Sequence, residues 1–224
     1  MTTFVLIPGA GGVALYWREL VIELESRGHV AVAVDIREDD PALGLPEYAA
    51  LVDEAIGAHR DVVVVAQSMG GFTAPMLARR EALARIVLLN AMIPLPGETP
   101  GEWWEATGQP DARATADAAA GRSGEFDLET YFLHDIPDDV KAAMAGADRA
   151  PADTPFGQPC TFQAWPAVPT HVLVGADDRF FPAAFQVRVA RERLGVEADV
   201  LPGGHLLAKS RPADLAERLL TYLA

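Results

Sequence analysis

Short apolar runs alternate along the chain with segments of helical periodicity. The runs are rich in β-branched residues, and Val62 to Val65 is the plainest of them. Runs that are apolar throughout are typical of parallel strands that are covered on both faces. The pattern predicts an α/β fold with a mostly parallel sheet of about six strands. The expected strands are residues 4–7, 30–35, 61–66, 85–90, 171–175 and 197–201.

Helices are expected between these strands. Apolar residues recur at steps of three and four over residues 17–24 and 215–223, which is the spacing of one helix face. Pro182 and Pro212 stand where the first turn of a helix accepts proline. The alternation stops between residues 93 and 168, where aromatic, Ala, Gly and Pro residues dominate. We interpret this segment as a helical cap inserted into one domain whose core is residues 1–92 and 169–224.

Composition narrows the classes of partner. Thirty-two acidic residues against eighteen Lys and Arg give a formal net charge of −14, which argues against a protein that binds nucleic acid. Only two of the eighteen cations are lysines, Lys141 and Lys209. The single cysteine, Cys160, excludes an intrachain disulfide and a Cys-based zinc site.

No signal peptide or membrane segment is expected. The first apolar run lacks a preceding basic stretch, and no run approaches the ~20 residues of a membrane helix. The expectation is a cytoplasmic protein that acts on a small molecule without a membrane partner. The sequence is compatible with both a monomer and a homodimer.

The glycine-rich loop at residues 8–12, of sequence PGAGG, allows two interpretations. Gly9, Gly11 and Ala14 fit the dinucleotide-binding pattern, and Asp35 stands where an acid that binds ribose would be. Alternatively, a loop that follows a strand can direct backbone N–H groups toward an oxyanion. A third possibility is that the glycines only permit a tight turn.

A candidate nucleophile follows the third strand. Ser68 lies in AQSMGG, where small residues stand two positions before and after it, as a sharp strand–turn–helix elbow requires. We expect a helical segment that begins near Met69. The alternative is a serine that caps this helix.

A base and an acid follow two later strands. His205 lies in a Pro-Gly-Gly-His loop after the last strand, whereas the other four histidines stand in positions typical of surface or packing residues. Asp177 and Asp178 both follow the strand at 171–175, and either could orient an imidazole. The order serine, aspartate, histidine, with each residue after a strand, favours a catalytic triad.

These motifs together resemble the α/β-hydrolase family from Phe4 to the end of the chain. The resemblance rests on the loop at residues 8–12, the elbow around Ser68, the turn at residues 175–182 and the loop before His205. The most similar group is the small plant-type esterases and hydroxynitrile lyases. The resemblance implies that Asp178 is the acid, and that the oxyanion hole is formed by the backbone N–H groups of Ala10 and Met69.

The chain departs from the family pattern in three places. The family usually has a histidine before the first glycine and another before the serine, where this chain has Pro8 and Gln67. Neither histidine is the base, so we expect only the support of the oxyanion loop to differ. The sequence begins almost at the first parallel strand, so we expect a reduced core of six parallel strands without the amino-terminal hairpin of the family.

The resemblance implies a serine hydrolase for small, neutral, hydrophobic carboxylic esters, with neither a cofactor nor a metal. Trp103, Trp104, Phe180 and Phe181 are candidate substrate-binding residues. The principal alternative is a protein of the same fold that binds a ligand without turnover. Lyases of this group carry a threonine where Gly9 stands and a lysine where Leu206 stands, so lyase activity is disfavoured. The dinucleotide interpretation leaves Ser68 and the loop of His205 unexplained.

Overall fold

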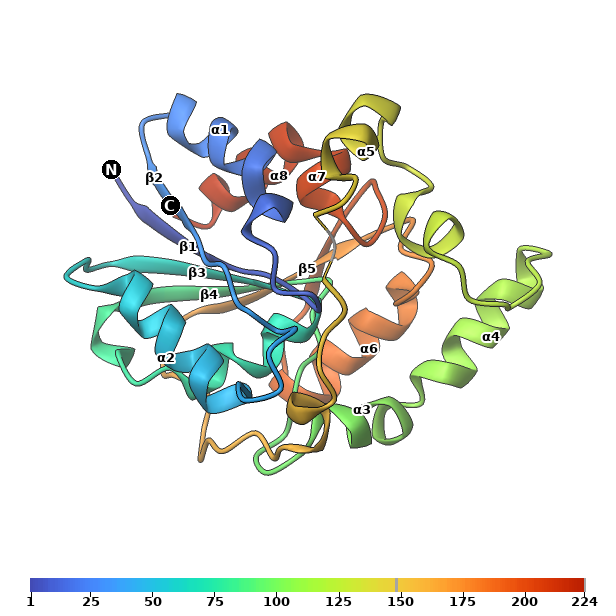
Figure 1. Ribbon diagram of the computed structural model, residues 1–224, viewed down its shortest axis with the longest axis horizontal. Helices are drawn as coiled ribbons and strands as arrows, with labels where there is room; N and C mark the ends of the chain where they lie inside the picture. The colour runs from blue at the N-terminus through green and yellow to red at the C-terminus, as the bar shows by residue number, and fades with distance from the viewer. Residues whose placement is uncertain (148, 224) are drawn as a thin grey trace.

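A computed structural model describes residues 1–147 and 149–223 of the chain. It contains one sheet of six parallel strands in the order β2-β1-β3-β4-β5-β6 (Figure 1), which confirms the predicted architecture. The predicted strands differ from the observed ones by one or two residues at their ends. The strands are β1 (Thr3–Ile7), β2 (Val30–Ala33), β3 (Val62–Gln67), β4 (Leu83–Leu89), β5 (Thr170–Gly175) and β6 (Ala198–Leu201).

Helices cover both faces of the sheet. The helices α1 (Arg18–Ser26), α7 (Leu207–Ser210) and α8 (Pro212–Thr221) lie on one face, and α2 (Leu45–Ile56) and α6 (Ala183–Leu194) on the other. In β1, Phe4 and Leu6 join the first layer whereas Val5 and Ile7 join the second. Strands with two buried faces explain why the runs are apolar throughout.

The helical periodicity near the two ends of the chain produces helices that pack together. Trp17, which directly precedes α1, Leu20 in α1, and Leu215 and Leu219 in α8 are fully buried in one cluster. An ion pair, in which the lysine is buried and the glutamate is partly exposed, joins α7 to α1. The Nζ of Lys209 donates to the carboxylate of Glu19 and to the carbonyl of Leu15, at 2.6 and 2.7 Å.

The segment after Ser68 is less helical than the sequence predicts. Three short 3₁₀ turns, Ser68–Phe72, Ala74–Met76 and Arg80–Ala82, replace the expected continuous helix. Consecutive glycines disfavour a helix, and Pro75 cannot donate a helical hydrogen bond.

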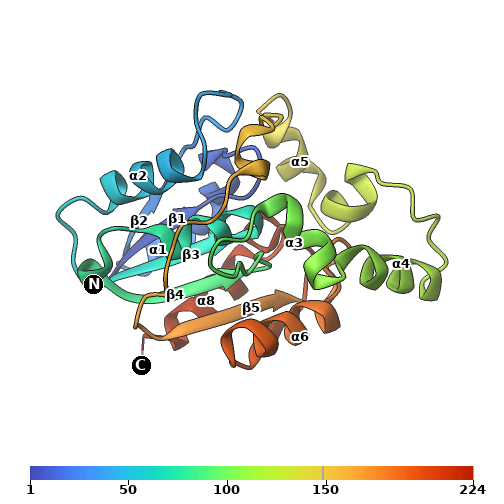
Figure 2. The same ribbon diagram turned by 90° about the horizontal axis from the view of Figure 1, so that it is seen from below.

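Residues 93–168 connect β4 to β5, and their described part contains helices and turns but no strand. Figure 2 shows that α4 and α5 lie beyond the carboxyl ends of the strands. None of the described helices is long and apolar enough to span a membrane. The elements are α3 (Pro100–Thr107), α4 (Gln109–Ala119), a π-helical turn (Glu129–Leu133), α5 (Asp138–Met144) and a 3₁₀ turn (Thr154–Gly157).

Candidate active site

Ser68 lies at a sharp turn directly after β3. Its φ of +50° is in the left-handed region, which is rare for a residue other than glycine. The turn brings backbones so close that a Cβ on Gly70 would lie 2.6 Å from the carbonyl oxygen of Pro8. A Cβ on Gly71 would lie 1.9 Å from that of Met92. Glycine is therefore required at both positions. The strained serine lies at the carboxyl edge of the sheet, directly after β3.

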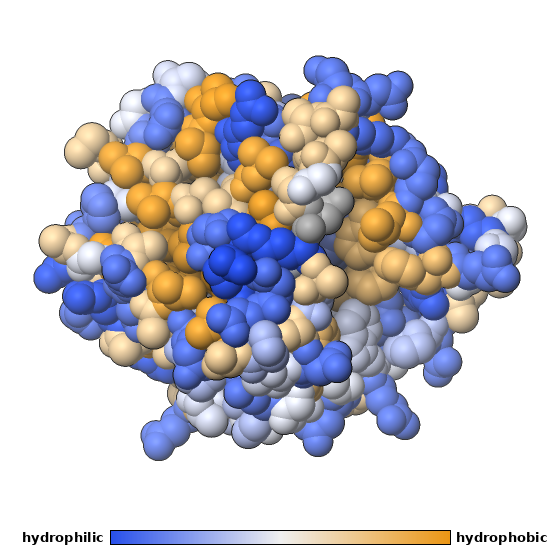
Figure 3. Space-filling view, viewed as in Figure 1, coloured by the Kyte–Doolittle hydropathy of each residue, from blue (hydrophilic) through white to orange (hydrophobic). Residues whose placement is uncertain are grey.

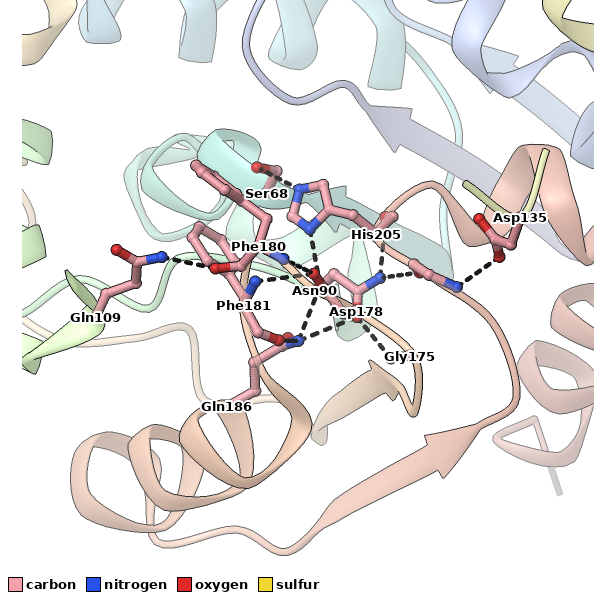
Figure 4. A network of polar contacts seen from close by, with 11 residues as sticks. Ser68, Asn90, Gln109, Asp135, Gly175, Asp178, Phe180, Phe181, Gln186 and His205 are labelled. Atoms are coloured by element: carbon pink, nitrogen blue, oxygen red, sulfur yellow. Dashed lines mark hydrogen bonds and ion pairs between the residues drawn. The ribbon is translucent and has the colours of Figure 1, made fainter. Parts of the chain in front are cut away.

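His205 lies between Ser68 and Asp178 (Figure 4). Its Nε2 is 3.1 Å from the Ser68 Oγ, and its Nδ1 is 2.8 Å from the Asp178 Oδ2. Because a carboxylate only accepts hydrogen bonds, Nδ1 carries the imidazole proton. The lone pair of Nε2 then faces the serine hydroxyl. This geometry allows His205 to act as a base toward Ser68.

The two neighbouring aspartates have different partners. Oδ1 of Asp178 accepts the N–H groups of Phe180 and Phe181, at 2.9 and 2.8 Å. Its Oδ2 accepts from the Gln186 side chain at 3.1 Å, in addition to His205. Asp177 instead accepts the N–H of Gly203 at 3.0 Å, in the loop that precedes the histidine. Of the two aspartates that the sequence left open, Asp178 contacts the imidazole and Asp177 contacts the loop that precedes it.

Sequence reasoning missed two further residues that hold this loop. Asn90 follows β4 and its side chain donates to the carbonyls of Gly204 and His205. Asp135, from the segment between β4 and β5, accepts the N–H of Gly204 at 2.6 Å. Each contact spans at least 69 residues of sequence, so no local motif indicates it. The one available signal was a polar residue, Asn90, at the end of an apolar run.

The loop at residues 8–12, which we call the oxyanion loop, lies against Ser68. A Cβ on Gly9 would be 2.9 Å from the Ser68 Cβ. Within the described chain, the N–H of Ala10 has no hydrogen-bond partner, and both Ala10 and Met69 line the cavity beside Ser68. The N–H of Gly11 donates to the Glu38 carboxyl at 2.7 Å.

Glu38 is a buried acid that sequence reasoning also missed. Only 2% of the residue is exposed, and this burial raises the pKa of its carboxyl to about 8, although the Gly11 N–H and Arg149 act in the opposite direction. The Glu38 carboxyl accepts the Gly11 N–H, and a bound pyrophosphate would need this N–H as a hydrogen-bond donor. Asp35 likewise pairs with Arg149 and accepts the N–H of Ala14. The dinucleotide interpretation therefore finds no support in this loop.

A cavity of about 640 Å³ opens above Ser68 and His205. Apolar side chains, aliphatic and aromatic, form most of its lining, and Figure 3 shows apolar side chains on both halves of this face, with hydrophilic ones between them. Lys141 and Arg149 also line it, each paired with a carboxylate. The aromatic lining residues are Tyr16, Trp104, Phe126, Phe132, Phe156 and Phe180.

The structure separates the four aromatic residues proposed to bind substrate. Trp104 and Phe180 line the cavity, whereas Trp103 and Phe181 are fully buried in the core behind it. Trp103 donates from its indole N–H to the Ile93 carbonyl at 3.2 Å. Phe181 lies edge-on to the His205 ring, with centroids 5.1 Å apart. These two residues support the site and do not form its surface.

The described residues contain no group of three His, Cys, Asp or Glu side chains placed to hold a metal ion. The contacts at the site place a serine hydroxyl, an imidazole and a carboxylate in series. A hydrogen bond from an adjacent backbone N–H group would stabilise negative charge that develops on a substrate oxygen.

The sequence matches the alpha/beta hydrolase family over residues 4–218, so the chain belongs to this family, as its motifs indicated. No curated protein sequence matches it. Similar solved structures include polyneuridine aldehyde esterase (TM-score 0.81, 18% identity, 100% of each chain covered). A pyrethroid hydrolase from Sphingobium faniae JZ-2 has a TM-score of 0.75 at 21% identity, with 99% of this chain and 96% of that chain covered.

An extracellular alpha/beta-hydrolase from a Paenibacillus species is also similar, with a TM-score of 0.77, 19% identity and coverage of 99% of this chain and 98% of that chain. It is described as sharing structural and functional homology with tobacco salicylic acid binding protein 2. At these identities the likeness shows a common fold, and the activity has to be argued from the site.

Proposed function

We propose that the protein hydrolyses small, neutral, hydrophobic carboxylic esters, with Ser68 as nucleophile, His205 as base and Asp178 as acid. One observation carries the proposal: the unbroken contacts from the Ser68 hydroxyl through the imidazole to the buried carboxylate, at 3.1 and 2.8 Å. The family membership and the esterases and hydrolases among similar structures agree with it.

The reaction has two halves. In the first, His205 Nε2 takes the Ser68 proton while Oγ attacks the ester carbonyl, and the Asp178 carboxylate stabilises the imidazolium that forms. The N–H groups of Ala10 and Met69 donate to the oxyanion, each worth roughly 3–4 kcal/mol in the transition state. His205 then protonates the alcohol oxygen as the ester C–O bond breaks, which leaves the acyl group bound to the Ser68 Oγ as an acyl-enzyme. In the second half, His205 takes a proton from a water whose oxygen attacks the acyl carbonyl, and it returns that proton to Oγ as the acid leaves.

The surroundings of the triad favour an apolar substrate. The rings of Phe132 and Phe180 lie edge-on to the imidazole, with centroid distances of 4.9 and 5.6 Å. They exclude water from the side of His205 that they cover. A cavity of about 640 Å³ with a mainly apolar lining that includes six aromatic residues suits an alkyl or aryl ester. We take residues 93–168, which supply much of this lining, as a cap over the core.

Replacing the serine tests the proposal directly. We expect Ser68→Ala to abolish turnover of p-nitrophenyl acetate and labelling by a fluorophosphonate while the circular dichroism spectrum is unchanged. Ser26→Ala, at an exposed serine, is the matched control and should retain both. Undiminished turnover in Ser68→Ala would exclude the proposed mechanism. Turnover of a series of esters of graded chain length by the unmodified protein would then define the preferred substrate.

A further inference from the structure

Asn90 occupies an unusual place for a polar residue. It directly follows β4, it is fully buried, and it is the only asparagine in the chain. Its φ of +43° is in the left-handed region, which asparagine and glycine tolerate better than other residues. Its backbone N–H donates to the Leu173 carbonyl at 2.9 Å, so the turn is anchored to β5.

The side-chain amide of Asn90 forms hydrogen bonds to two segments, with its oxygen as acceptor from the end of β5 and its nitrogen as donor to the loop of His205. Oδ1 accepts the N–H of Gly175 at 2.7 Å. Nδ2 donates to the carbonyls of Gly204 and His205, at 3.1 and 3.0 Å. Figure 4 shows Asn90 among the strand end at Gly175, the Asp178 turn and the loop of His205. The amide therefore joins the segment that carries the acid to the segment that carries the base.

A second contact strengthens this link. The Nε2 of Gln186 lies 3.1 Å from Asp178 Oδ2 and 3.4 Å from Asn90 Oδ1, so the amide and the carboxylate share a donor. The loop of residues 202–205 contains two glycines and cannot hold its own shape through side chains. A Cβ on Gly175 would lie 2.6 Å from the carbonyl oxygens of Gly203 and Gly204. The end of β5 and the loop of His205 are therefore already as close as their backbones allow.

We propose that Asn90 is a positioning residue that sets the orientation of His205 relative to Asp178. This inference rests on the proposed ester hydrolysis. Asn90 does not line the cavity, so it acts through the two loops and not on the substrate. Loss of its amide should therefore reduce the rate of the chemical step and leave substrate binding nearly unchanged, because a misplacement of about 1 Å can cost roughly 10²-fold in rate.

Two variants separate the amide from the backbone conformation. Asn90→Gly tolerates the positive φ and removes the amide, and Asn90→Asp keeps the size of the side chain but cannot donate to the two carbonyls. We expect both to lower kcat by about 10- to 100-fold with KM within about threefold. In Asn90→Asp the added carboxylate, near Asp178, should also move the acid limb of the kcat profile to higher pH, because it stabilises the imidazolium.

A merely structural role would give a different result. Tyr222→Phe removes a hydrogen bond from the hydroxyl of the buried Tyr222 to the Asp199 carboxylate at 2.5 Å, away from the triad and the cavity. We expect it to lower the midpoint of urea unfolding without a change in kcat. If both folded Asn90 variants retain kcat within twofold, or if Tyr222→Phe shows the same fall in kcat, the inference is wrong.

One measurement does not depend on ester hydrolysis. The proton on His205 Nδ1 gives an NMR signal that reports its hydrogen bond to Asp178, and we expect this signal to shift or broaden in both Asn90 variants. If the unmodified protein neither hydrolyses esters nor reacts with a fluorophosphonate, the proposed function fails, and the NMR signal still tests the role of Asn90. An unchanged signal in both variants would overturn it.

Discussion

Two glycine-containing loops meet at the carboxyl edge of the sheet, and they are held in opposite ways. In the base loop, residues 202–205, four backbone groups accept or donate hydrogen bonds to the side chains of Asn90, Asp135 and Asp177. In the oxyanion loop, the Glu38 carboxyl holds the N–H of Gly11, but the N–H of Ala10 has no partner in the described chain.

The difference follows from what each loop supplies. The base loop presents a side chain, so hydrogen bonds can hold several of its backbone groups while the imidazole of His205 faces Ser68. The oxyanion loop presents a backbone N–H, which has to remain unpaired so that it can donate a hydrogen bond to the oxyanion. A loop that contributes a side chain can thus have its backbone groups paired, whereas a loop that contributes a backbone group has to keep that group free.

The largest effect expected from this contrast comes from the histidine. His205→Ala should lower kcat about 10⁴-fold or more, because the base is lost. The matched change in the other loop, Ala10→Ser, should leave kcat within about threefold, because the backbone donor is retained. Steady-state hydrolysis of p-nitrophenyl acetate measures both. A large loss in Ala10→Ser would contradict a purely backbone role for this loop.

A change in the backbone of the oxyanion loop should have an intermediate effect. A Cβ on Gly9 would lie 2.2 Å from the Gln67 Oε1 and 2.9 Å from the Ser68 Cβ, so Gly9→Ala has to displace the loop. We expect kcat to fall about 10²- to 10³-fold, as when one oxyanion donor is lost. Gly157→Ala is the control, since open space surrounds that glycine and its φ is negative or extended. Equal rates in the two variants would show that the loop can shift without consequence.

The last effect concerns stability and not rate, and it involves the acid behind the oxyanion loop. Burial raises the pKa of Glu38 to about 8 from 4.5, so between these values the folded protein holds a proton that the unfolded chain releases. The free energy of unfolding should therefore fall as pH rises from about 4.5 to 8, by up to about 1.4 kcal/mol per pH unit. Below pH 4.5 both states are protonated and this contribution no longer changes.

Urea unfolding at several pH values measures this dependence. Glu38→Gln should remove the slope that Glu38 contributes, whereas Glu25→Gln, at an exposed position of α1, should keep it. Identical slopes in the unmodified protein and in Glu38→Gln would show that the carboxyl does not titrate in this range.

The strands and the proposed triad could be predicted because their signals are local. Each strand is an apolar run, and Ser68, Asp178 and His205 each follow one, so parallel pairing alone brings them to the same edge. Asn90 could not be assigned a role, because its contacts span 85 to 115 residues. Glu38 reaches Gly11 across 27 residues and belongs to no motif.

The orientation of aromatic side chains was also beyond the sequence. Trp103 and Trp104 are neighbours on α3, and adjacent residues of a helix point in different directions. Only the rotation of the helix about its axis decides that Trp104 lines the cavity and that Trp103 is buried in the core. The expected helix after Ser68 became short turns for a similar reason, because close packing of Gly71 against Met92 fixes the path of the chain.

The scarcity of lysine has a practical consequence for attaching the protein to a solid support. Of its two lysines, Lys209 is 1% exposed and paired with Glu19, so amine-directed coupling reagents cannot reach it. Lys141 is accessible and lines the cavity above Ser68. Reagents that couple through lysine would therefore attach a tether at the substrate cavity, and immobilisation through a lysine introduced on the opposite surface would keep that cavity open.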